Sequence, residues 1–463
     1  MQYATVNPYT GQTVKTFDFA TDAQIDSALA KAHETFLAWR ETSLESRAAI
    51  LQKAADLLRA DARRYAEILT LEMGKIIGEA EAEVELCANI LEYYVQHGAA
   101  PLAPRTLKAK GFADGDAQLV KEPLGVLFAI EPWNFPFYQV IRITAPQVTA
   151  GNVIVLKHAE IVPQSALAMV ELFRQAGAPE GLLTNLFLTH DGASRVINDK
   201  RVKGIALTGS ERAGSAVAAQ AGKAMKKSTL ELGGADAYIV LSDAEVEKAA
   251  RWAVFGRHWN AGQVCVSSKR IILEDSIYER FMAVYREGVA ALVAGDPMDP
   301  ATQLAPLSSA AARDNLARQV EAAIAAGATA ETLGAPVPTQ GAFYQPTILT
   351  NITKDNPAFH TEFFGPVSSI YRVANEEEAI AIANDSPYGL GGSVFTTDIA
   401  RAKRVAAKIE TGMVYINQPT GVKADLPFGG VKNSGYGHEL IDLGLTEFVN
   451  EKLVVVTDID GSF

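Results

Sequence analysis

From about residue 125 onward, short apolar runs alternate with stretches of helical periodicity, and this alternation constrains the fold more than any other feature. Runs that read as strands occupy residues 125–130, 153–156, 183–189 and 204–207. Helical patterns lie between and after them, at 163–175 and 211–226. Strands that alternate with helices predict a parallel sheet covered on both faces. We therefore expect an α/β fold.

The alternation then continues in a second series. Strand-like runs at 237–241, 270–273 and 393–396 are separated by sequence that includes helical patterns at 277–294 and 399–409. The chain thus predicts two α/β bodies, the second running from about residue 233 to residue 440.

Two segments are predicted to leave these bodies. Prolines and glycines punctuate the polar stretch before residue 125, which is typical of an excursion from the main fold. A Val-rich run at 453–458 would be an aggregation-prone edge unless another element or subunit covered it. We expect both segments to form an interface arm.

The first hundred residues are predicted to be mostly helical. Thr21 and Gln24 have the spacing of a capping box, and apolar residues recur at helical spacing from Ile25 to Trp39. Further helices are expected over 44–72 and 75–96.

Composition limits the classes of function. Asp and Glu number 54 against 42 Lys and Arg, a net charge of −12 that argues against binding nucleic acid or anionic membranes. No apolar run is long enough for a membrane span, and the N-terminus lacks the features of a signal peptide. Two distant cysteines fit a reducing cytoplasm, and the seven scattered histidines predict no metal site.

One cysteine stands out by its position. Cys265 follows a Gly-containing stretch and precedes the predicted strand at 270–273. A thiolate there could act as a nucleophile if its pKa were lowered or a base lay beside it. On this segment alone a buried structural cysteine is the better interpretation, since free cysteine is among the most buried residue types.

Two more segments place a polar side chain where chemistry could use it. Glu231 lies between two leucines, and an apolar setting raises the pKa of a carboxyl group towards that of a general base. Asn134 lies in a turn rich in proline and aromatic residues, at the strand edge where α/β sheets bind ligands, and its amide could donate to an oxyanion. An exposed strand end and a packed aromatic loop are the respective alternatives.

A fourth segment runs from the strand at 204–207 into Gly209 and Ser210, which open a helix. A helix start with small residues can bind an anion, although a plain strand-to-helix turn is the alternative. The chain has no G-x-G-x-x-G fingerprint, P-loop or G-x-S-x-G elbow, so phosphoryl transfer and serine hydrolysis lack their usual signals.

Taken in order, these four segments resemble the aldehyde dehydrogenase superfamily over essentially the whole chain. The segments EFFGPV (362–367) and PFGGVKNSG (427–435) add to the resemblance, and EPWNFPFYQVIR (131–142) is most similar to bacterial succinate-semialdehyde dehydrogenases. The resemblance implies a Rossmann-type dinucleotide-binding domain (1–104 and 125–232) and an α/β catalytic domain (233–440). It also implies a small β oligomerisation arm (105–124 and 441–463) and a homodimer or homotetramer.

The resemblance also implies a mechanism. Cys265 would attack the aldehyde to give a thiohemiacetal, whose oxyanion the Asn134 amide would hold. Loss of hydride to the nicotinamide would leave a thioester, and Glu231 would activate the water that hydrolyses it. The intact trio argues against the alternative of a non-catalytic structural homologue, and Glu231 argues against a relative that transfers the acyl group to CoA or phosphate.

For the cofactor, the resemblance assigns Lys157 and Glu160 to the adenosine ribose, and Glu362 with Phe364 to the nicotinamide ribose. The pyrophosphate and other cofactor contacts fall to Gly209, Ser210, Gly214, Pro132, Trp133 and Leu232. A carboxylate at Glu160 accepts hydrogen bonds from a free 2′-hydroxyl and repels a 2′-phosphate, so NAD is the predicted preference. Lys157 acts in the opposite direction, which keeps NADP open.

For the substrate, the resemblance points to Arg142. An arginine here binds the distal carboxylate of a semialdehyde, and a salt-bridged structural arginine is the alternative. Phe135, Trp259 and Lys423 are the other predicted substrate contacts, with Lys423 standing where some relatives have a serine. The predicted substrate is succinate semialdehyde; another short semialdehyde or an uncharged aldehyde is the alternative.

Overall fold

The computed structural model describes residues 2–110 and 112–460. Its N-terminal part begins with a two-stranded ribbon of β1 (Tyr3–Val6) and β2 (Thr13–Phe17). A helical layer follows: α1 (Asp22–Trp39), α2 (Leu44–Ala60), α3 (Ala62–Met73), α4 (Ile77–His97) and the short α5 (Ala99–Leu102). The predicted capping box is present, because Gln24 donates its backbone N–H to Thr21 and accepts the N–H of Thr21 in return.

The single helix expected over 44–72 is wrong in one respect. Asp61 has φ −130° and ψ 32°, which ends α2 and separates it from α3. Aspartate is a poor residue for a helix interior, because its short side chain competes for nearby backbone groups. The break therefore has a local cause that apolar periodicity alone does not reveal.

The first sheet has six strands in the order β19-β9-β8-β5-β6-β7. Its parallel strands are β5 (Val126–Glu131), β6 (Val153–His158), β7 (Leu183–Asn185), β8 (Val202–Thr208) and β9 (Lys227–Glu231). Helices α6 (Pro136–Ala150), α7 (Pro163–Gln175), α8 (His190–Asn198) and α9 (Glu211–Lys223) connect or follow them. Because both faces are covered, all six residues of β6 are buried, which explains the apolar runs in the sequence.

One strand of this sheet comes from far along the chain. Strand β19 (Gly435–Tyr436) pairs antiparallel with β9. The segment was expected to belong to the second body, yet its backbone completes the first sheet. The predicted domain boundaries otherwise stay a prediction.

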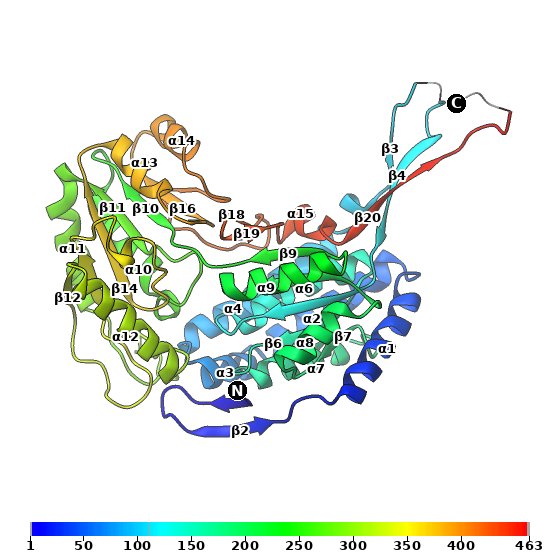
Figure 1. Cartoon of the computed structure of the whole chain (residues 1–463), viewed down its shortest axis with the longest axis horizontal. Helices are drawn as coiled ribbons and strands as arrows, with labels where there is room; N and C mark the ends of the chain where they lie inside the picture. Colours follow the sequence, from blue (N-terminus) through cyan, green and yellow to red (C-terminus); the bar gives the residue numbers. More distant parts are fainter. Residues whose placement is uncertain (1, 111, 461–463) are drawn as a thin grey trace.

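The second sheet has seven strands in the order β12-β13-β14-β11-β10-β16-β17. They are β12 (Thr329–Thr332), β13 (Thr347–Thr350), β14 (Val367–Val373), β11 (Arg270–Glu274), β10 (Ala237–Val240), β16 (Gly392–Phe395) and β17 (Tyr415–Ile416). The accompanying helices are α10 (Val246–His258), α11 (Tyr278–Ala290), α12 (Ala310–Ala325), α13 (Glu376–Asn384) and α14 (Ile399–Ala406). Each body thus has its own sheet, as Figure 1 shows.

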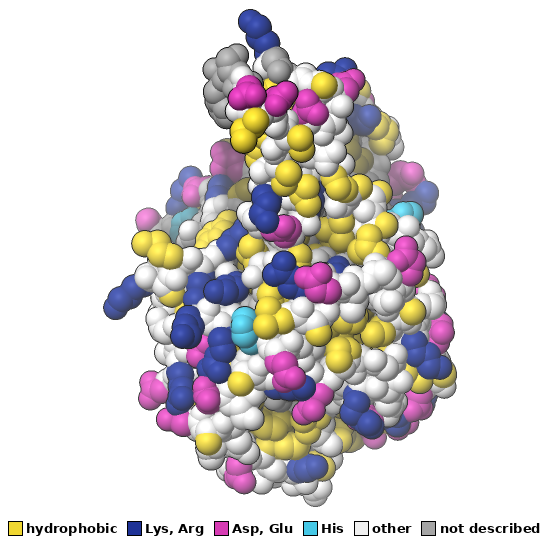
Figure 2. Space-filling model, turned by 90° about the vertical axis from the view of Figure 1, so that its right-hand side faces the viewer, with side chains coloured by type: hydrophobic (Ala, Val, Ile, Leu, Met, Phe, Trp, Pro, Cys, Tyr) yellow, Lys and Arg dark blue, Asp and Glu magenta, His cyan; other side chains and the backbone are white. Residues whose placement is uncertain are grey.

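A three-stranded antiparallel arm projects from the first body, on the side away from the second (Figure 1). It joins β3 (Arg105–Thr106), β4 (Ala117–Pro123) and β20 (Val449–Val455), so the two segments predicted to leave the main fold do meet. The helix α15 (Ile441–Thr446) lies just before β20. Figure 2 shows hydrophobic side chains on the arm and around its base; Leu453, Val454 and Val456 are exposed. Within the described residues, no helix is both long and apolar enough to cross a membrane.

Candidate active site

A cavity of about 220 Å³ brings most of the predicted catalytic and nicotinamide-side residues together. The first body contributes the loop after β5 and the turn after β8, and the second contributes the cysteine loop and the loop before β14. Its lining includes Pro132, Trp133, Asn134, Gly209, Ser210, Leu232, Cys265, Glu362 and Phe364. Residues from five separate segments therefore share one cavity, because Leu232 follows β9.

Cys265 lies in the loop that joins η1 (Trp259–Gly262) to β11. The turn before it is held in the left-handed region, with φ of 50° at Asn260 and 52° at Ala261, a conformation that non-glycine residues adopt at a cost. Burial raises the pKa of the thiol to about 12, against the lowering effect of the Lys269 and Arg142 charges. The resting thiol is thus protonated, and nucleophilic attack requires a base.

Asn134 is held from three sides. Its Nδ2 donates to the backbone oxygen of Gln263 (3.1 Å), and its Oδ1 lies 2.9 Å from the side-chain amide of Gln139. Its backbone oxygen accepts from Nδ2 of Asn260 (2.9 Å). These bonds fix the amide while leaving its second N–H for another acceptor, which is the preorganisation that an oxyanion donor needs.

Glu231 ends β9 with its side chain buried, at 3% exposure. Neither of its carboxyl oxygens has a hydrogen-bond partner in the part of the chain that the structure describes. Burial raises its pKa to about 8, although the nearby Arg142 charge acts to lower it. A buried carboxyl group that makes no structural hydrogen bond, and whose pKa is in this range, is suited to accept a proton.

Arg142, on α6, is only 2% exposed and is not among the described residues that line the cavity around Cys265. Its Nη2 donates to Oγ1 of Thr208 (2.8 Å), and its Nη1 donates to the Tyr138 hydroxyl (3.3 Å). Its Nε lies 3.8 Å from Oε2 of Glu439 and has no hydrogen-bond partner among the described residues. The Nε–H of the guanidinium is therefore uncommitted.

Two carboxyl groups near Arg142 were not named by the sequence analysis. Burial raises the pKa of Glu131 and of Glu439, with Arg142 opposing the shift in both. Glu131 ends β5, so its strand-end position was a usable signal. Glu439 lies about 300 residues from Arg142 in sequence, and no local pattern reveals their contact.

A second cavity, of about 470 Å³, adjoins the first and shares Pro132, Trp133 and Thr208 with it. It continues to Lys157 and Glu160 at the end of β6 and to Arg212 at the start of α9. The two cavities form one elongated path along the carboxyl edge of the first sheet. This path fits an extended dinucleotide, whose anionic centre would meet the N-terminus of α9.

The cofactor-side residues differ in how they take part. Lys157 donates to Glu160 at 2.8 Å, and although burial acts to raise the pKa of Glu160, this ammonium makes the net shift downward. Ser210 caps α9 by accepting from the backbone N–H of Ala213. Gly214 was predicted as a cofactor contact, but it lines neither cavity. It gives α9 close packing instead, because a Cβ there would lie 2.7 Å from the side chain of Leu232.

On the substrate side, aromatic rings cluster beside Asn134. The Phe135 ring lies 5.5 Å from that of Trp259 and 6.1 Å from that of Tyr138. The Lys423 side chain is exposed, and no hydrogen bond or ion pair among the described residues joins it to the cavity around Cys265. The structure thus brings together Phe135 and Trp259 but not Lys423.

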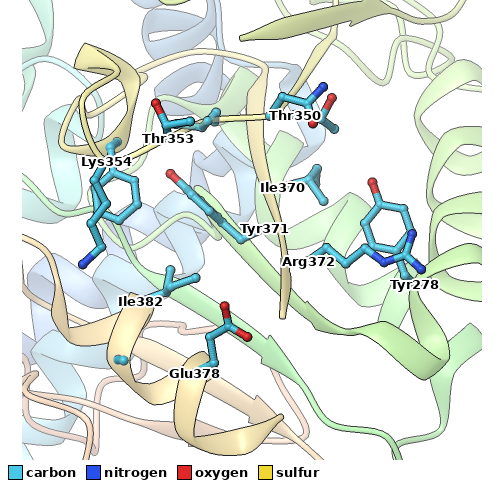
Figure 3. A pocket seen from close by; sticks show the side chains of 13 residues that line it. Tyr278, Thr350, Thr353, Lys354, Ile370, Tyr371, Arg372, Glu378 and Ile382 are labelled. Carbon is cyan, nitrogen blue, oxygen red and sulfur yellow. The ribbon is translucent and has the colours of Figure 1, made fainter. Parts of the chain in front are cut away.

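A larger cavity, of about 640 Å³, lies elsewhere, between β14, the end of β13 and α13 (Figure 3). Its two cations are already paired: Arg372 with Asp275 and Glu279, and Lys354 with Asp385. None of its lining residues was predicted for the site. We therefore place the candidate active site at the Cys265 cavity.

Comparison with known proteins gives this geometry a family. The sequence profile of the Aldehyde dehydrogenase family matches residues 1–454. The chain belongs to the aldehyde dehydrogenase family. It is 48% identical to a protein of Deinococcus radiodurans named succinate-semialdehyde dehydrogenase (NADP(+)), over 98% of this chain and 94% of the relative. A relative from Mycobacterium avium with the same name is 45% identical, over 98% and 96%.

Solved structures agree. The crystal structure of succinic semialdehyde dehydrogenase from Streptococcus pyogenes, in complex with NADP+, matches with a TM-score of 0.96 and 48% identity, covering 98% of this chain and 100% of that one. The predicted family and its α/β fold are thus confirmed, and this aldehyde dehydrogenase is an oxidoreductase. The predicted preference for NAD is not supported, since these relatives are described with NADP. The Lys157–Glu160 pair offers a physical reason, because the charge that would repel a 2′-phosphate is already compensated.

Proposed function

We propose that this aldehyde dehydrogenase oxidises succinate semialdehyde to succinate through a covalent intermediate on Cys265. The observation that carries the proposal is the shared cavity of Cys265 and Asn134, together with the unpartnered carboxyl group of Glu231. Glu231 precedes the lining residue Leu232, and its charge acts on the Cys265 thiol. The names of the relatives support the choice of substrate.

Attack begins when Cys265 Sγ gives up its proton to solvent water and the resulting thiolate adds to the aldehyde carbon. The carbonyl oxygen becomes an oxyanion, which accepts the free N–H of Asn134 and the backbone N–H of Cys265. A preorganised donor of this kind stabilises the transition state by roughly 3 kcal/mol. The bonds to Gln263 and Gln139 hold the amide ready, so little reorganisation is needed when charge develops.

A nicotinamide dinucleotide fits the elongated path between the two cavities and, when bound, supplies the acceptor for the hydride. Lys157 and Glu160 would hold its adenosine end, Ser210 would face its pyrophosphate, and Glu362 would hold the ribose next to the nicotinamide. Trp133 and Phe364 meet edge to face, with ring centroids 5.7 Å apart, and line the cavity on this side.

Oxidation leaves an acyl group on Cys265 as a thioester. Glu231 takes a proton from a water molecule, and the resulting hydroxide attacks the thioester carbon and releases the carboxylate with the free thiol. Because the carboxyl oxygens of Glu231 have no other partner among the described residues, they are available to this water. A dedicated hydrolytic base argues against transfer of the acyl group to CoA or phosphate.

The far end of the substrate is assigned to Arg142. Its Nε has no partner within the described ranges, and its charge acts on the Cys265 thiol. We infer that a short semialdehyde spans the two side chains. Burial raises the pKa of Glu131, Glu231 and Glu439, which disfavours the charged form of these carboxyl groups beside the guanidinium. Phe135 and Trp259 would form the apolar walls between the two ends.

A further proposal concerns the choice of cofactor. We infer that the enzyme accepts NADP as well as NAD, because the charge of Lys157 offsets that of Glu160 and because Arg212 lines the same cavity. Glu160→Gln should raise the ratio of kcat/KM for NADP to that for NAD by roughly fivefold, the size expected for one partly screened charge. An unchanged ratio would remove Glu160 as the determinant.

The arm is assigned to self-association. Its exposed valines and the unpaired outer side of β20 suit a second copy of the chain, as a homodimer or homotetramer. Light scattering of the purified protein tests this, and a monomer at micromolar concentration would contradict it.

The activity itself is tested by steady-state assays of reduced-cofactor absorbance with succinate semialdehyde, glutarate semialdehyde and butanal, each with NAD and NADP. We expect the highest kcat/KM with succinate semialdehyde, without added CoA. Equal values for butanal would favour a broad-specificity enzyme. No turnover with any aldehyde would contradict the proposal.

A further inference from the structure

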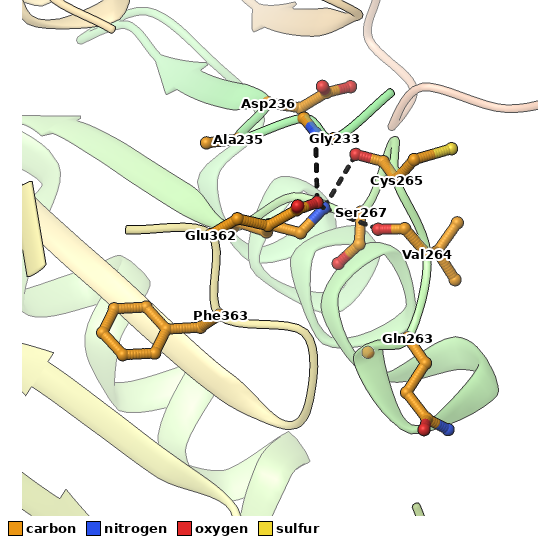
Figure 4. Close-up of polar contacts among 12 residues, drawn as sticks. Gly233, Ala235, Asp236, Gln263, Val264, Cys265, Ser267, Glu362 and Phe363 are labelled. Atoms are coloured by element: carbon orange, nitrogen blue, oxygen red, sulfur yellow. Dashed lines mark hydrogen bonds and ion pairs between the residues drawn. The ribbon is translucent and has the colours of Figure 1, made fainter. Parts of the chain in front are cut away.

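A buried lysine joins the nucleophile loop to the cofactor side of the cavity. Lys269, four residues after Cys265, is only 1% exposed. Its Nζ donates to the backbone oxygens of Val264 (2.5 Å) and Cys265 (2.7 Å), and it lies 3.3 Å from Oε1 of Glu362 (Figure 4). These three partners match the three N–H groups of an ammonium ion, so its position is fully determined.

Glu362 is held differently, because it belongs to the cavity surface. The same oxygen that pairs with Lys269 accepts the backbone N–H of Gly234 (3.0 Å), while the side chain as a whole is 18% exposed and lines the Cys265 cavity. The ring of Phe364 lies 5.7 Å from the Lys269 ammonium. A substitution at Glu362 would therefore change the charge next to Lys269. Because Lys269 binds the backbone at Cys265, the substitution would also affect the nucleophile.

We propose that Lys269 is a positioning residue, which fixes the backbone around Cys265 and favours ionisation of its thiol. Glu362 is the counter-ion of Lys269 and partly offsets this effect on the thiol. This inference rests on the proposed function, because it takes Cys265 as the nucleophile. Lys269 is suited to the role because its carbonyl partners keep the cation in place whether or not a ligand is bound. Arg142, by contrast, is assigned to the substrate.

The charges around the thiol support this reading. Lys269 and Arg142 act to lower the pKa of Cys265, against burial, whereas Glu231 and Glu362 act to raise it. Tyr138 also faces the thiol, and Asp236 and Arg257 act on Lys269 from neighbouring elements. Because a nearby cation favours a thiolate and a nearby anion disfavours it, removing Lys269 and removing Glu362 should have opposite effects.

The experiment measures the rate of Cys265 alkylation by iodoacetamide against pH, in the full-length protein without substrate or cofactor. Peptide mass spectrometry follows Cys265 separately from Cys87, which is fully buried. Lys269→Met should slow alkylation at neutral pH by about tenfold, equal to one pKa unit, and move the midpoint of the profile to higher pH. Glu362→Gln should speed it and move the midpoint to lower pH.

Two variants separate this role from a merely structural one. Lys226 also donates to two backbone oxygens, those of Ile197 and Asp199, so Lys226→Met is a matched control that should leave the profile unchanged. Lys269→Arg keeps the charge and should restore most of the midpoint.

An unchanged midpoint in Lys269→Met, with a melting curve like that of the unsubstituted protein, would overturn the proposal. If Lys269→Met fails to fold, Glu362→Gln decides, and an unchanged or raised midpoint there would overturn it equally. Alkylation needs no turnover, so this result stays readable even if no aldehyde is oxidised. A failure here would in turn leave the proposed reaction standing.

Discussion

Two buried glutamates in this molecule have raised pKa values for the same physical reason, yet they are treated in opposite ways. Glu72, on α3, accepts from the hydroxyl of Thr5, the backbone N–H of Gln164, and both the N–H and the hydroxyl of Ser165. Glu231 accepts from no described residue. Glu72 therefore links α3 to β1 and to the start of α7, whereas the carboxyl group of Glu231 makes no such link. The contrast separates a structural carboxyl group from one reserved for chemistry.

The contrast extends to the surroundings. Near Glu231, one oxygen of Glu131 and Nε of Arg142 also lack partners among the described residues. An unsatisfied buried polar atom costs roughly 1–3 kcal/mol, so such a cluster is expensive to keep in a folded protein. Substrate and water at the proposed active site would supply the missing partners.

The largest effect is expected when the Cys265 sulfur, which carries the acyl group that Glu231 helps to release, is removed. Cys265→Ala should abolish aldehyde oxidation, by at least about four orders of magnitude in kcat, because the covalent route is lost. Cofactor binding, measured by fluorescence titration, should stay within a few-fold of the parent protein. Retained turnover would refute the assignment of the nucleophile.

The next prediction concerns Glu231 itself. Glu231→Gln should lower kcat by roughly 10²–10³-fold, since an amide cannot accept the proton of the attacking water. In the parent enzyme the carboxyl group must be ionised to act, and its pKa is raised to about 8, so kcat should rise as the pH increases from 7 to 9. The variant should lose this rise. If the variant kept the pH profile of the parent enzyme, Glu231 would not be the group whose ionisation controls kcat.

Arg142 sharpens the comparison on the substrate side. Arg142→Met should raise KM for succinate semialdehyde about thirtyfold, roughly 2 kcal/mol, the size of a hydrogen bond to a charged group. Butanal is the matched control, because it has the same chain length without the carboxylate, and its KM should change little. Equal losses for both substrates would mean that the role of Arg142 is structural.

The smallest effect on activity is expected at Glu72. Glu72→Gln should lower the free energy of unfolding by about 1–3 kcal/mol, because the amide nitrogen faces donors that the carboxylate accepted. Its kcat should match that of the parent enzyme. Glu231→Gln should do the reverse, with little loss of stability, and denaturant melts of the two variants side by side test the pair.

Much of this organisation could be predicted from the sequence. Strands buried on both faces, such as β5 and β6, leave apolar runs that are easily recognised, and the ordered segments around Asn134, Glu231 and Cys265 indicated the family. In each of those segments the candidate catalytic residue and the residues that form its turn are adjacent in sequence. The structure then brought them into one cavity.

What the sequence could not predict depends on contacts between distant residues. Neither the Arg142–Glu439 contact nor the pairing of Lys269 with Glu362 leaves a local pattern. The sequence analysis weighed Glu160 above Lys157 in predicting NAD, and the direct contact between the two side chains, which only the structure shows, changes that balance. The close packing of Gly214 against Leu232, which lies in another segment, leaves no local pattern either, and the assignment of Gly214 to the cofactor stays a prediction.

The central claim is that an acyl group is formed on Cys265 and released by the water that Glu231 activates. The most direct measurement is mass spectrometry of Glu231→Gln quenched during turnover with succinate semialdehyde and NADP. The account predicts a succinyl group on the peptide that contains Cys265, accumulating in the variant and absent from Cys265→Ala. If the peptide never gains that mass while reduced cofactor is still produced, the account is contradicted.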